Sequence, residues 1–331
     1  MKLSLDCVSY AGYFYQGDVP SLEEVIKRAA KYGFDGVDLF PHRPREFPMD
    51  ISTDRRKAIV DLAASLDIEI ACVGAATNFM LSDHILAQRQ DKELLFVREC
   101  CKLASDLHCK VVRIFAAWLG YFMPEHWDQG YSAPAMHSRS LDVSTEDDYL
   151  RQWEHIRQGI REAGRIASEY GVTLALQNHP PITNNVKDTI EMVEEVGLDS
   201  VKICLDLPLF EKQDDDSVRD TVVQVGDRMV HSHMIGIRFK ESLAGRCGFE
   251  EVVPGEGREN WPAFLKACKE VGFSGYMAYE QCSAIILEGH KKASLGEVDR
   301  RAQAGLDYMK NLMNRLGAYS GKKASALNAA S

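Results

Sequence analysis

Short apolar runs alternate with longer amphipathic segments along most of the chain. Eight runs of four to six residues are rich in apolar and β-branched residues, which predicts strands over 3–8, 36–40, 69–73, 111–115, 173–177, 201–205, 229–233 and 276–279. Each run is followed by a segment with helical periodicity. Ser21 and Glu24 have the spacing of a capping box at the start of the first helix. Further helices are predicted near 54–66, 91–107, 150–171, 187–195, 217–225, 261–271 and 297–316.

Eight strand–helix units predict a (β/α)8 barrel, an α/β fold whose usual length is about 250 residues. We expect one such domain over 1–316 of the 331 residues. Most of the excess length lies in 116–145, an aromatic-rich insertion after the fourth strand that we expect to form a lid at the catalytic end. The segment 317–331 is rich in Ala, Ser, Gly and Lys, which is typical of a flexible tail.

Polar side chains follow four successive strands at the end where such barrels build their active sites. They are Gln177, Asp206, the pair His231 and His233, and Glu280. Buried carboxylates that converge on one axis repel one another, and a divalent metal removes that conflict. We expect Gln177, Asp206, His233 and Glu280 to bind one ion, either Mn²⁺ or Mg²⁺. His233 is preferred to His231 because it lies nearer the catalytic end. The alternative is a buried hydrogen-bond network without metal.

Charge and cysteine content narrow the class of protein. The chain has 39 Lys and Arg against 49 Asp and Glu, a net charge of −10, which argues against general binding of nucleic acid or of anionic membranes. No apolar run approaches the roughly 18 residues that cross a bilayer, and no signal peptide is evident, so we expect a cytoplasmic protein. The nine cysteines lack CxxC spacing and are expected to be reduced core residues.

The chain resembles the xylose-isomerase-like barrels, which include sugar-phosphate isomerases, keto-sugar epimerases and endonuclease IV. The likeness rests on segments 32–38 and 271–276, on 254–257 with Trp261, and on the polar strand ends. It implies a divalent metal held by Glu, Asp, His and Glu at the positions of Gln177, Asp206, His233 and Glu280. Gln177 departs from this pattern, because the family's Glu at that position also transfers a proton and a neutral amide cannot.

A second base must therefore come from elsewhere if the chemistry needs one. The insertion offers His126 and His137, and His179 follows the fifth strand. A neutral imidazole is a suitable general base near neutral pH. We expect His137 or His179 to serve alongside Glu280.

A closer resemblance is to the catalytic subunits of bacterial C-glycoside deglycosidases and related 3-keto-glycoside lyases. It rests on segments 40–44, 47–50, 136–139 and 177–181. It implies a small-molecule 3-keto glycoside as substrate, proton removal next to the ketone, β-elimination of the aglycone, and a smaller partner subunit in a hetero-oligomer. The substrate contacts expected on this basis are His42, Arg43, Asn178, His231 and Arg238.

Other functions are consistent with parts of the pattern. The main alternative is a keto-sugar isomerase or epimerase that uses Glu280 and a histidine. A DNA-repair nuclease is disfavoured by the acidic charge and by too few ligands for three metals. A non-catalytic binding barrel is disfavoured because it would not require Asp206, His233 and Glu280 together. Dinucleotide-dependent redox chemistry is disfavoured because no strand is followed by GxGxxG.

Overall fold

Eight parallel strands form a closed barrel in the computed structural model, which describes residues 1–80, 86–117, 146–180, 182–183, 185–241 and 247–322. Neighbouring strands follow the order β1, β10, β7, β6, β5, β4, β3, β2, and β2 closes the barrel against β1. The strands are β1 (Lys2–Asp6), β2 (Gly36–Leu39), β3 (Glu69–Gly74), β4 (Val111–Ile114), β5 (Thr173–Gln177), β6 (Val201–Cys204), β7 (Met229–Met234) and β10 (Tyr276–Tyr279). The predicted (β/α)8 barrel is confirmed.

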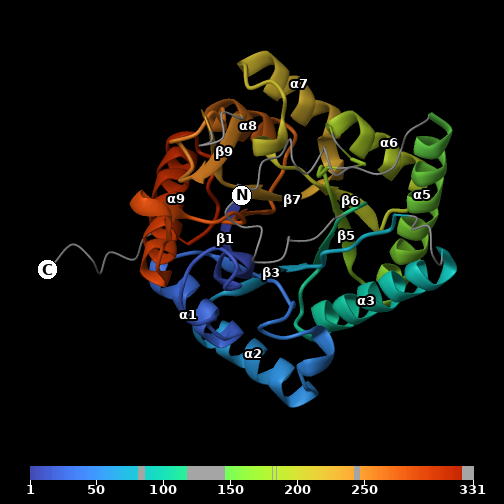
Figure 1. The fold of residues 1–331 in the computed structure, drawn as a ribbon, viewed down its shortest axis with the longest axis horizontal. Coiled ribbons are helices and arrows are strands. Elements are labelled where there is room, and N and C mark those ends of the chain that lie inside the picture. The colour runs from blue at the N-terminus through green and yellow to red at the C-terminus, as the bar shows by residue number, and fades with distance from the viewer. Residues whose placement is uncertain (81–85, 118–145, 181, 184, 242–246, 323–331) are drawn as a thin grey trace, which may run out of the picture.

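Helices surround the barrel, as Figure 1 shows. They are α1 (Leu22–Tyr32), α2 (Thr53–Ser65), α3 (Leu86–Asp106), α5 (Glu146–Glu169), α6 (Val186–Val196), α7 (Asp215–Val225), α8 (Trp261–Glu270) and α9 (Leu295–Arg315). The capping box of Ser21 and Glu24 starts α1, and Gly33 ends it in the left-handed conformation with φ of 92°. The apolar faces of the helices pack on the outward side chains of the strands in one continuous core.

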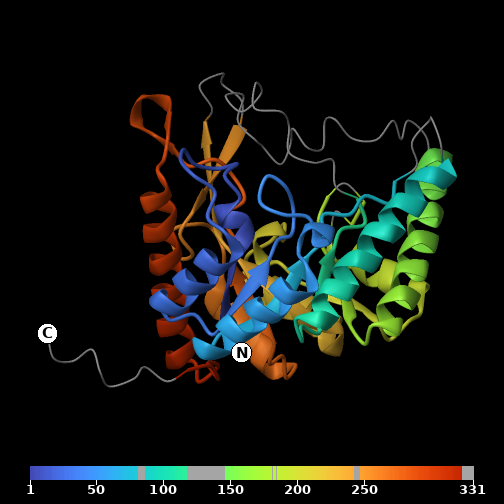
Figure 2. The same ribbon diagram turned by 90° about the horizontal axis from the view of Figure 1, so that it is seen from below.

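Two antiparallel hairpins that we did not predict interrupt the strand–helix alternation. One pairs β8 (Gly236–Glu241) with β9 (Cys247–Val252) between β7 and α8, and the other pairs β11 (Ile286–Leu287) with β12 (Lys291–Lys292) before α9. In Figure 2 the N-terminus, where β1 begins, lies on the lower side and the β8–β9 hairpin rises on the upper side. This hairpin therefore stands at the carboxyl end of the barrel.

The chain directly after α9 returns to the amino end of the barrel and is bonded there. The Ser320 amide donates to the Met1 carbonyl at 2.9 Å, and the Tyr319 hydroxyl and the Lys322 amide donate to Asp35 Oδ1 at 2.8 and 2.7 Å. Residues 319–322 of the predicted flexible tail are therefore held in place by hydrogen bonds. Residues 323–331, 118–145 of the predicted lid, and His126 and His137 lie outside the described residues.

The remaining structural expectations concern cysteines and membranes. All eight cysteines whose side chains are described are free thiols, and seven of them are buried. Among the described helices, none has the length and apolarity that crossing a membrane requires.

Candidate metal centre

The side chains of Asp206 and His233 form the most closely bonded part of the site. Asp206 Oδ1 accepts from the His233 backbone amide at 2.8 Å, and Oδ2 lies 2.9 Å from His233 Nδ1. The Gln177 amide Nε2 also donates to Asp206 Oδ2, and the Cys204 thiol donates to Oδ1 at 3.5 Å. Since these residues end β5, β6 and β7, the barrel brings together three of the four predicted ligands.

Glu280, the fourth predicted ligand, directly follows β10 and is held less tightly. Its Oε2 lies 3.9 Å from His233 Nδ1 and its Oε1 lies 3.9 Å from Arg113 Nη2, both beyond hydrogen-bond distance. Asp6, at the end of β1, lies on the other side of the imidazole, with Oδ2 3.8 Å from His233 Nε2. His233 is therefore flanked by three buried carboxylates.

The electrostatics of these groups favour a cation. Burial alone would lower the pKa of His233, but Asp206 and Glu280 outweigh it and hold that pKa well above its ordinary value. Burial would likewise raise the pKa of Asp206, yet His233 keeps it below its ordinary value. Burial, with Glu280 and Asp38 next in effect, raises the pKa of Asp6 to about 7. The site thus stabilises positive charge among these side chains.

The donor set fits a divalent metal. Cys204, Asp206 and His233 each offer a ligand atom within 4.8 Å of the others, and so do Asp6, His233 and Glu280. Gln177 Oε1 is buried and has no hydrogen-bond partner among the described residues, although a buried acceptor normally has one. Carboxylate and amide oxygens with one imidazole suit Mn²⁺ or Mg²⁺.

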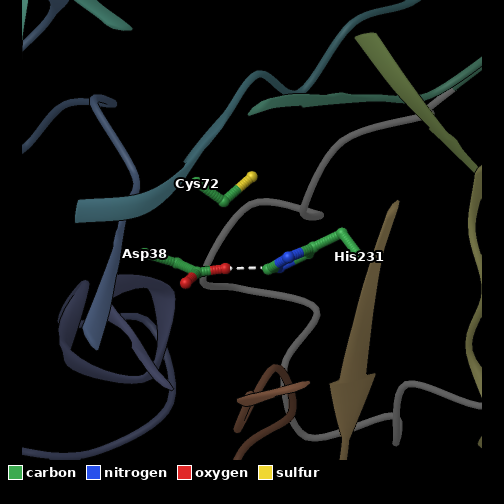
Figure 3. Close-up of side chains that lie close together, drawn as sticks. All are labelled: Asp38, Cys72 and His231. Carbon is green, nitrogen blue, oxygen red and sulfur yellow. Dashed lines mark hydrogen bonds and ion pairs between the residues drawn. The ribbon is translucent and has the colours of Figure 1, made fainter. Parts of the chain in front are cut away.

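A second buried layer lies one step deeper in the barrel. His231, two residues before His233, points from β7 toward Asp38 on β2, with Nε2 donating to Asp38 Oδ2 at 2.6 Å, and Cys72 of β3 lies beside them (Figure 3). Asp38, Cys72 and His231 also offer ligand atoms within 4.8 Å of one another. Because the short Asp38–His231 bond already occupies two of these groups, we interpret this layer as a hydrogen-bonded pair that supports the upper one.

Two predicted residues after β5 have different surroundings. Asn178 bonds the backbone of Asp206 twice, accepting from its amide at 2.8 Å and donating to its carbonyl at 3.2 Å, so it positions a predicted ligand. His179 packs 4.7 Å from the Phe115 ring, and its Nδ1 lies 2.6 Å from the Pro180 carbonyl oxygen. That carbonyl fixes the proton on Nδ1 and leaves Nε2 as an acceptor, while burial lowers the pKa of His179 to about 4.

The other expected substrate contacts are spread between the barrel mouth and the surface. His42 stacks on Phe40 with a centroid distance of 4.1 Å, and its Nε2 accepts from the Ala76 amide at 3.2 Å. Burial lowers the pKa of His42 to about 3. Arg43 is exposed and pairs with Asp50, with the closest approach at 2.9 Å. Their substrate roles stay predictions.

Arg238, the last expected contact, lies on the β8–β9 hairpin. Its side chain is exposed, and its Nη1 donates to Glu250 Oε1 at 3.3 Å. This surface ion pair gives Arg238 a local structural partner, and its substrate role also stays a prediction.

Sequence reasoning missed three charged residues inside the barrel: Asp6, Asp38 and Arg113. All are at most 2 % exposed. A usable signal was present, because each interrupts an apolar strand run at a position that alternation places on the inner face. Charged residues at such positions are rare unless paired or functional.

The β8–β9 hairpin fixes the segment that follows Glu280. Glu251 Oε2 accepts from the backbone amides of Cys282 and Ser283, both at 2.8 Å, and from the Gln281 side chain at 2.7 Å. Glu251 is buried, which raises its pKa to about 7. The hairpin is therefore part of the framework of the site.

The described fold and site agree with one family model, the xylose isomerase-like TIM barrel, which matches residues 26–312. The chain belongs to this family of proteins. The resemblance drawn from the sequence at this level is confirmed, whereas the narrower likeness to C-glycoside deglycosidases has no support in these comparisons.

Individual relatives are sugar epimerases or share the fold alone. Fructoselysine 3-epimerase of Escherichia coli O157:H7 is 21% identical over 280 residues, which is 81% of this chain and 88% of that protein. The structure of D-psicose 3-epimerase from Clostridium cellulolyticum H10 superposes with a TM-score of 0.68 at 19% identity, covering 95% of this chain and 99% of that one. The probable 3-DHS dehydratase AsbF of Bacillus anthracis has a TM-score of 0.65 at 18% identity, covering 94% and 99%.

Proposed function

We propose that this protein is a metal-dependent isomerase or epimerase of keto sugars, which moves a proton at a carbon next to a carbonyl group. The observation that carries the proposal is the buried group of Asp206, His233 and Glu280 at the carboxyl end of the barrel, with His233 within 3.9 Å of both carboxylates. Gln177, bonded to Asp206 through Nε2, adds an Oε1 without a partner among the described residues. The epimerases among the relatives support this reaction class over the lyase expected from the sequence.

A divalent Mn²⁺ or Mg²⁺ held by Gln177, Asp206, His233 and Glu280 would polarise the carbonyl and stabilise the negative charge that follows proton loss. Glu280 is the side chain suited to take the proton. The Asp206 oxygens are committed to His233, Gln177 and Cys204. The Glu280 oxygens, in contrast, lie 3.9 Å from basic nitrogens of Arg113 and His233, beyond hydrogen-bond distance. Their lone pairs are therefore available to a substrate.

Gln177 decides which proton transfers the site can perform. An amide cannot take a proton at neutral pH, so Glu280 has no carboxylate opposite it on β5. One base can move a proton between adjacent carbons on one face of an enediol, which is an aldose–ketose isomerisation. Inversion at a single carbon needs a second group on the other face, for which we propose His179 or His137.

The presence of Gln177 in place of a carboxylate on β5 also favours a second candidate function, cleavage of a 3-keto glycoside. In a β-elimination one base removes a proton and the electron pair expels the neighbouring substituent, so that no opposed base is required. Removal of the proton by Glu280 or a histidine would then release the aglycone. A smaller partner subunit and a cytoplasmic location belong to this proposal.

One experiment separates the candidates. The purified protein, assayed for metal content, is incubated in D₂O with D-fructose, D-psicose, fructoselysine and a 3-keto glucoside. An isomerase or epimerase gives a new sugar that carries solvent deuterium unless the base returns the original proton, whereas the lyase releases the aglycone. Asp206→Asn, which removes a charged ligand, is the matched inactive control. A metal-loaded protein that yields no new sugar, no deuterium incorporation and no aglycone with this panel would contradict both candidates.

A further inference from the structure

Arg113 of β4 is a buried cation with unused hydrogen-bond donors. Its side chain is 2 % exposed, and neither Nε nor Nη1 has a partner among the described residues. Its Nη2 is 3.9 Å from Glu280 Oε1, which is an electrostatic contact without a hydrogen bond. A buried guanidinium normally satisfies its donors, because losing water without new bonds costs several kcal/mol.

Arg56 shows what a structural arginine looks like in the same protein. It is 6 % exposed, and each of its nitrogens donates: Nε to the Ile51 carbonyl at 2.9 Å, Nη1 to Asp106 at 2.7 Å and Nη2 to the Pro48 carbonyl at 2.7 Å. Arg113 is as deeply buried as Arg56 but lacks the hydrogen bonds that Arg56 makes. Its conformation is therefore not explained by the bonds it makes within the described structure.

The surroundings of Arg113 hold the guanidinium at the candidate active site. Its central carbon lies 4.3 Å from the centre of the Phe115 ring. A Cβ on Gly74 would lie 3.1 Å from Nη2 and 3.3 Å from Phe40, so the glycine leaves room for the guanidinium. Burial acts against the charge, but Glu280 and Asp6 outweigh it and raise the pKa of Arg113, which therefore stays protonated.

We propose that Arg113 is a catalytic residue that donates hydrogen bonds from Nε and Nη1 to the substrate oxygen that becomes negative when the neighbouring carbon loses its proton. This inference rests on the proposed function. In that reaction a carboxylate takes the proton, the C–H electrons form the C=C bond of an enediolate, and the carbonyl π electrons move to the oxygen. Hydrogen-bond donors that are already in position stabilise the negative charge on this oxygen, because the protein does not have to rearrange as the charge forms.

The charge balance favours a transient anion over a permanently acidic substrate. Glu280 and Asp6 act on Arg113 directly, while Asp206 pairs with His233 and Asp38 with His231, so carboxylates already balance most of the positive charge in the site. Even with a divalent metal bound, the site would have little excess positive charge with which to bind the permanent carboxylate of an acidic substrate. We therefore assign the two donors to the carbonyl oxygen of a neutral keto sugar.

The test uses two small probes on Mn²⁺-loaded protein and does not depend on knowing the substrate. Acetohydroxamate is an anionic mimic of an enediolate, and hydroxyacetone is a neutral ketone. Calorimetry should show that Arg113→Met weakens acetohydroxamate binding about 10²- to 10³-fold and hydroxyacetone binding by less than about tenfold. Mn²⁺ affinity should stay equal or increase, because a neighbouring positive charge is removed.

Arg56→Met is the matched control, which should lower the unfolding midpoint while leaving acetohydroxamate affinity unchanged. Arg113→Lys keeps the charge but not the planar pair of donors, and it should lose at least about tenfold in acetohydroxamate affinity even if Arg113→Met fails to fold. Unchanged acetohydroxamate affinity in these Arg113 variants would overturn the proposal.

Two other outcomes would also overturn it. Parallel loss of Mn²⁺ and acetohydroxamate would mean that Arg113 only holds Glu280 in place. Turnover confined to sugar acids, with a change in KM alone for Arg113→Lys, would assign the donors to a fixed carboxylate. Failure of the proposed function is seen separately, as absence of turnover in the wild-type protein.

Discussion

His231 Nε2 donates a hydrogen bond of 2.6 Å to Oδ2 of Asp38, and this buried pair joins β7 to β2 through the interior of the barrel. The pair lies next to the candidate metal centre, with the rings of His231 and His233 5.2 Å apart. Burial alone would raise the pKa of Asp38, but the His231 charge and hydrogen bond outweigh it and lower that pKa. A buried pair of this kind is costly to break from one side only.

Asp38→Asn should therefore lower the free energy of unfolding of the metal-free protein by about 3 kcal/mol. The substitution leaves His231 buried without its charged partner. Denaturant unfolding followed by circular dichroism measures the loss. The double variant Asp38→Asn/His231→Gln should recover part of it, and a single variant as stable as the wild type would show that the pair contributes nothing.

Gln177→Glu should tighten metal binding at least tenfold while destabilising the metal-free protein. The new carboxylate would face Asp206 Oδ2, which now accepts a hydrogen bond from the Gln177 amide, so two negative charges would meet unless a cation lies between them. Calorimetric titration with Mn²⁺, together with melting temperatures with and without chelator, measures both effects. Gln177→Met, which lacks the amide oxygen, should bind metal more weakly than the wild type. Unchanged affinity in both variants would remove Gln177 from the ligand set.

Exchange of His179 and His137 for alanine distinguishes the two candidate bases. The variant that lacks the true base should lose roughly 10² to 10⁴ in rate and keep its metal. Because burial lowers the pKa of His179 to about 4, a rate that depends on neutral His179 should stay level from pH 6 to 8. Near-wild-type rates in both variants would mean that neither histidine is the base and would leave Glu280 as the sole candidate. Loss of metal in one variant would mean that the replaced histidine is a metal ligand.

Stability should fall as pH rises from about 4.5 to about 7, partly because of Glu251, whose pKa is raised to about 7. In this window the unfolded chain releases the Glu251 proton while the folded protein retains it, so ionisation favours unfolding. The contribution is at most about 3 kcal/mol. Unfolding free energies at pH 5 and pH 8 should differ less in Glu251→Gln than in the wild type. An identical difference in both proteins would assign the pH dependence to other groups.

The sequence alone determined the fold and indicated where the candidate site lies. Strand positions were predicted to within two residues because apolar runs and their alternation are local properties, and eight strand–helix units fit few closed arrangements. Because the carboxyl ends of all strands in a closed parallel barrel lie at one end, the residues that end β5, β6, β7 and β10 are expected around one axis. Gln177, Asp206, His233 and Glu280 could therefore be named before any contact was known.

Only the tertiary structure decided how the inner charges are partnered. Asp38 and His231 are 193 positions apart, and their contact depends on barrel closure and side-chain rotamers that no local pattern encodes. The hairpin that brings Glu251 to the segment after Glu280 was likewise invisible to a search for strand–helix units. The role proposed for Arg113 could not be predicted from the sequence. Arg113 differs from Arg56 in that two of its nitrogens have no hydrogen-bond partner among the described residues, and only the folded structure shows which donors are unpaired.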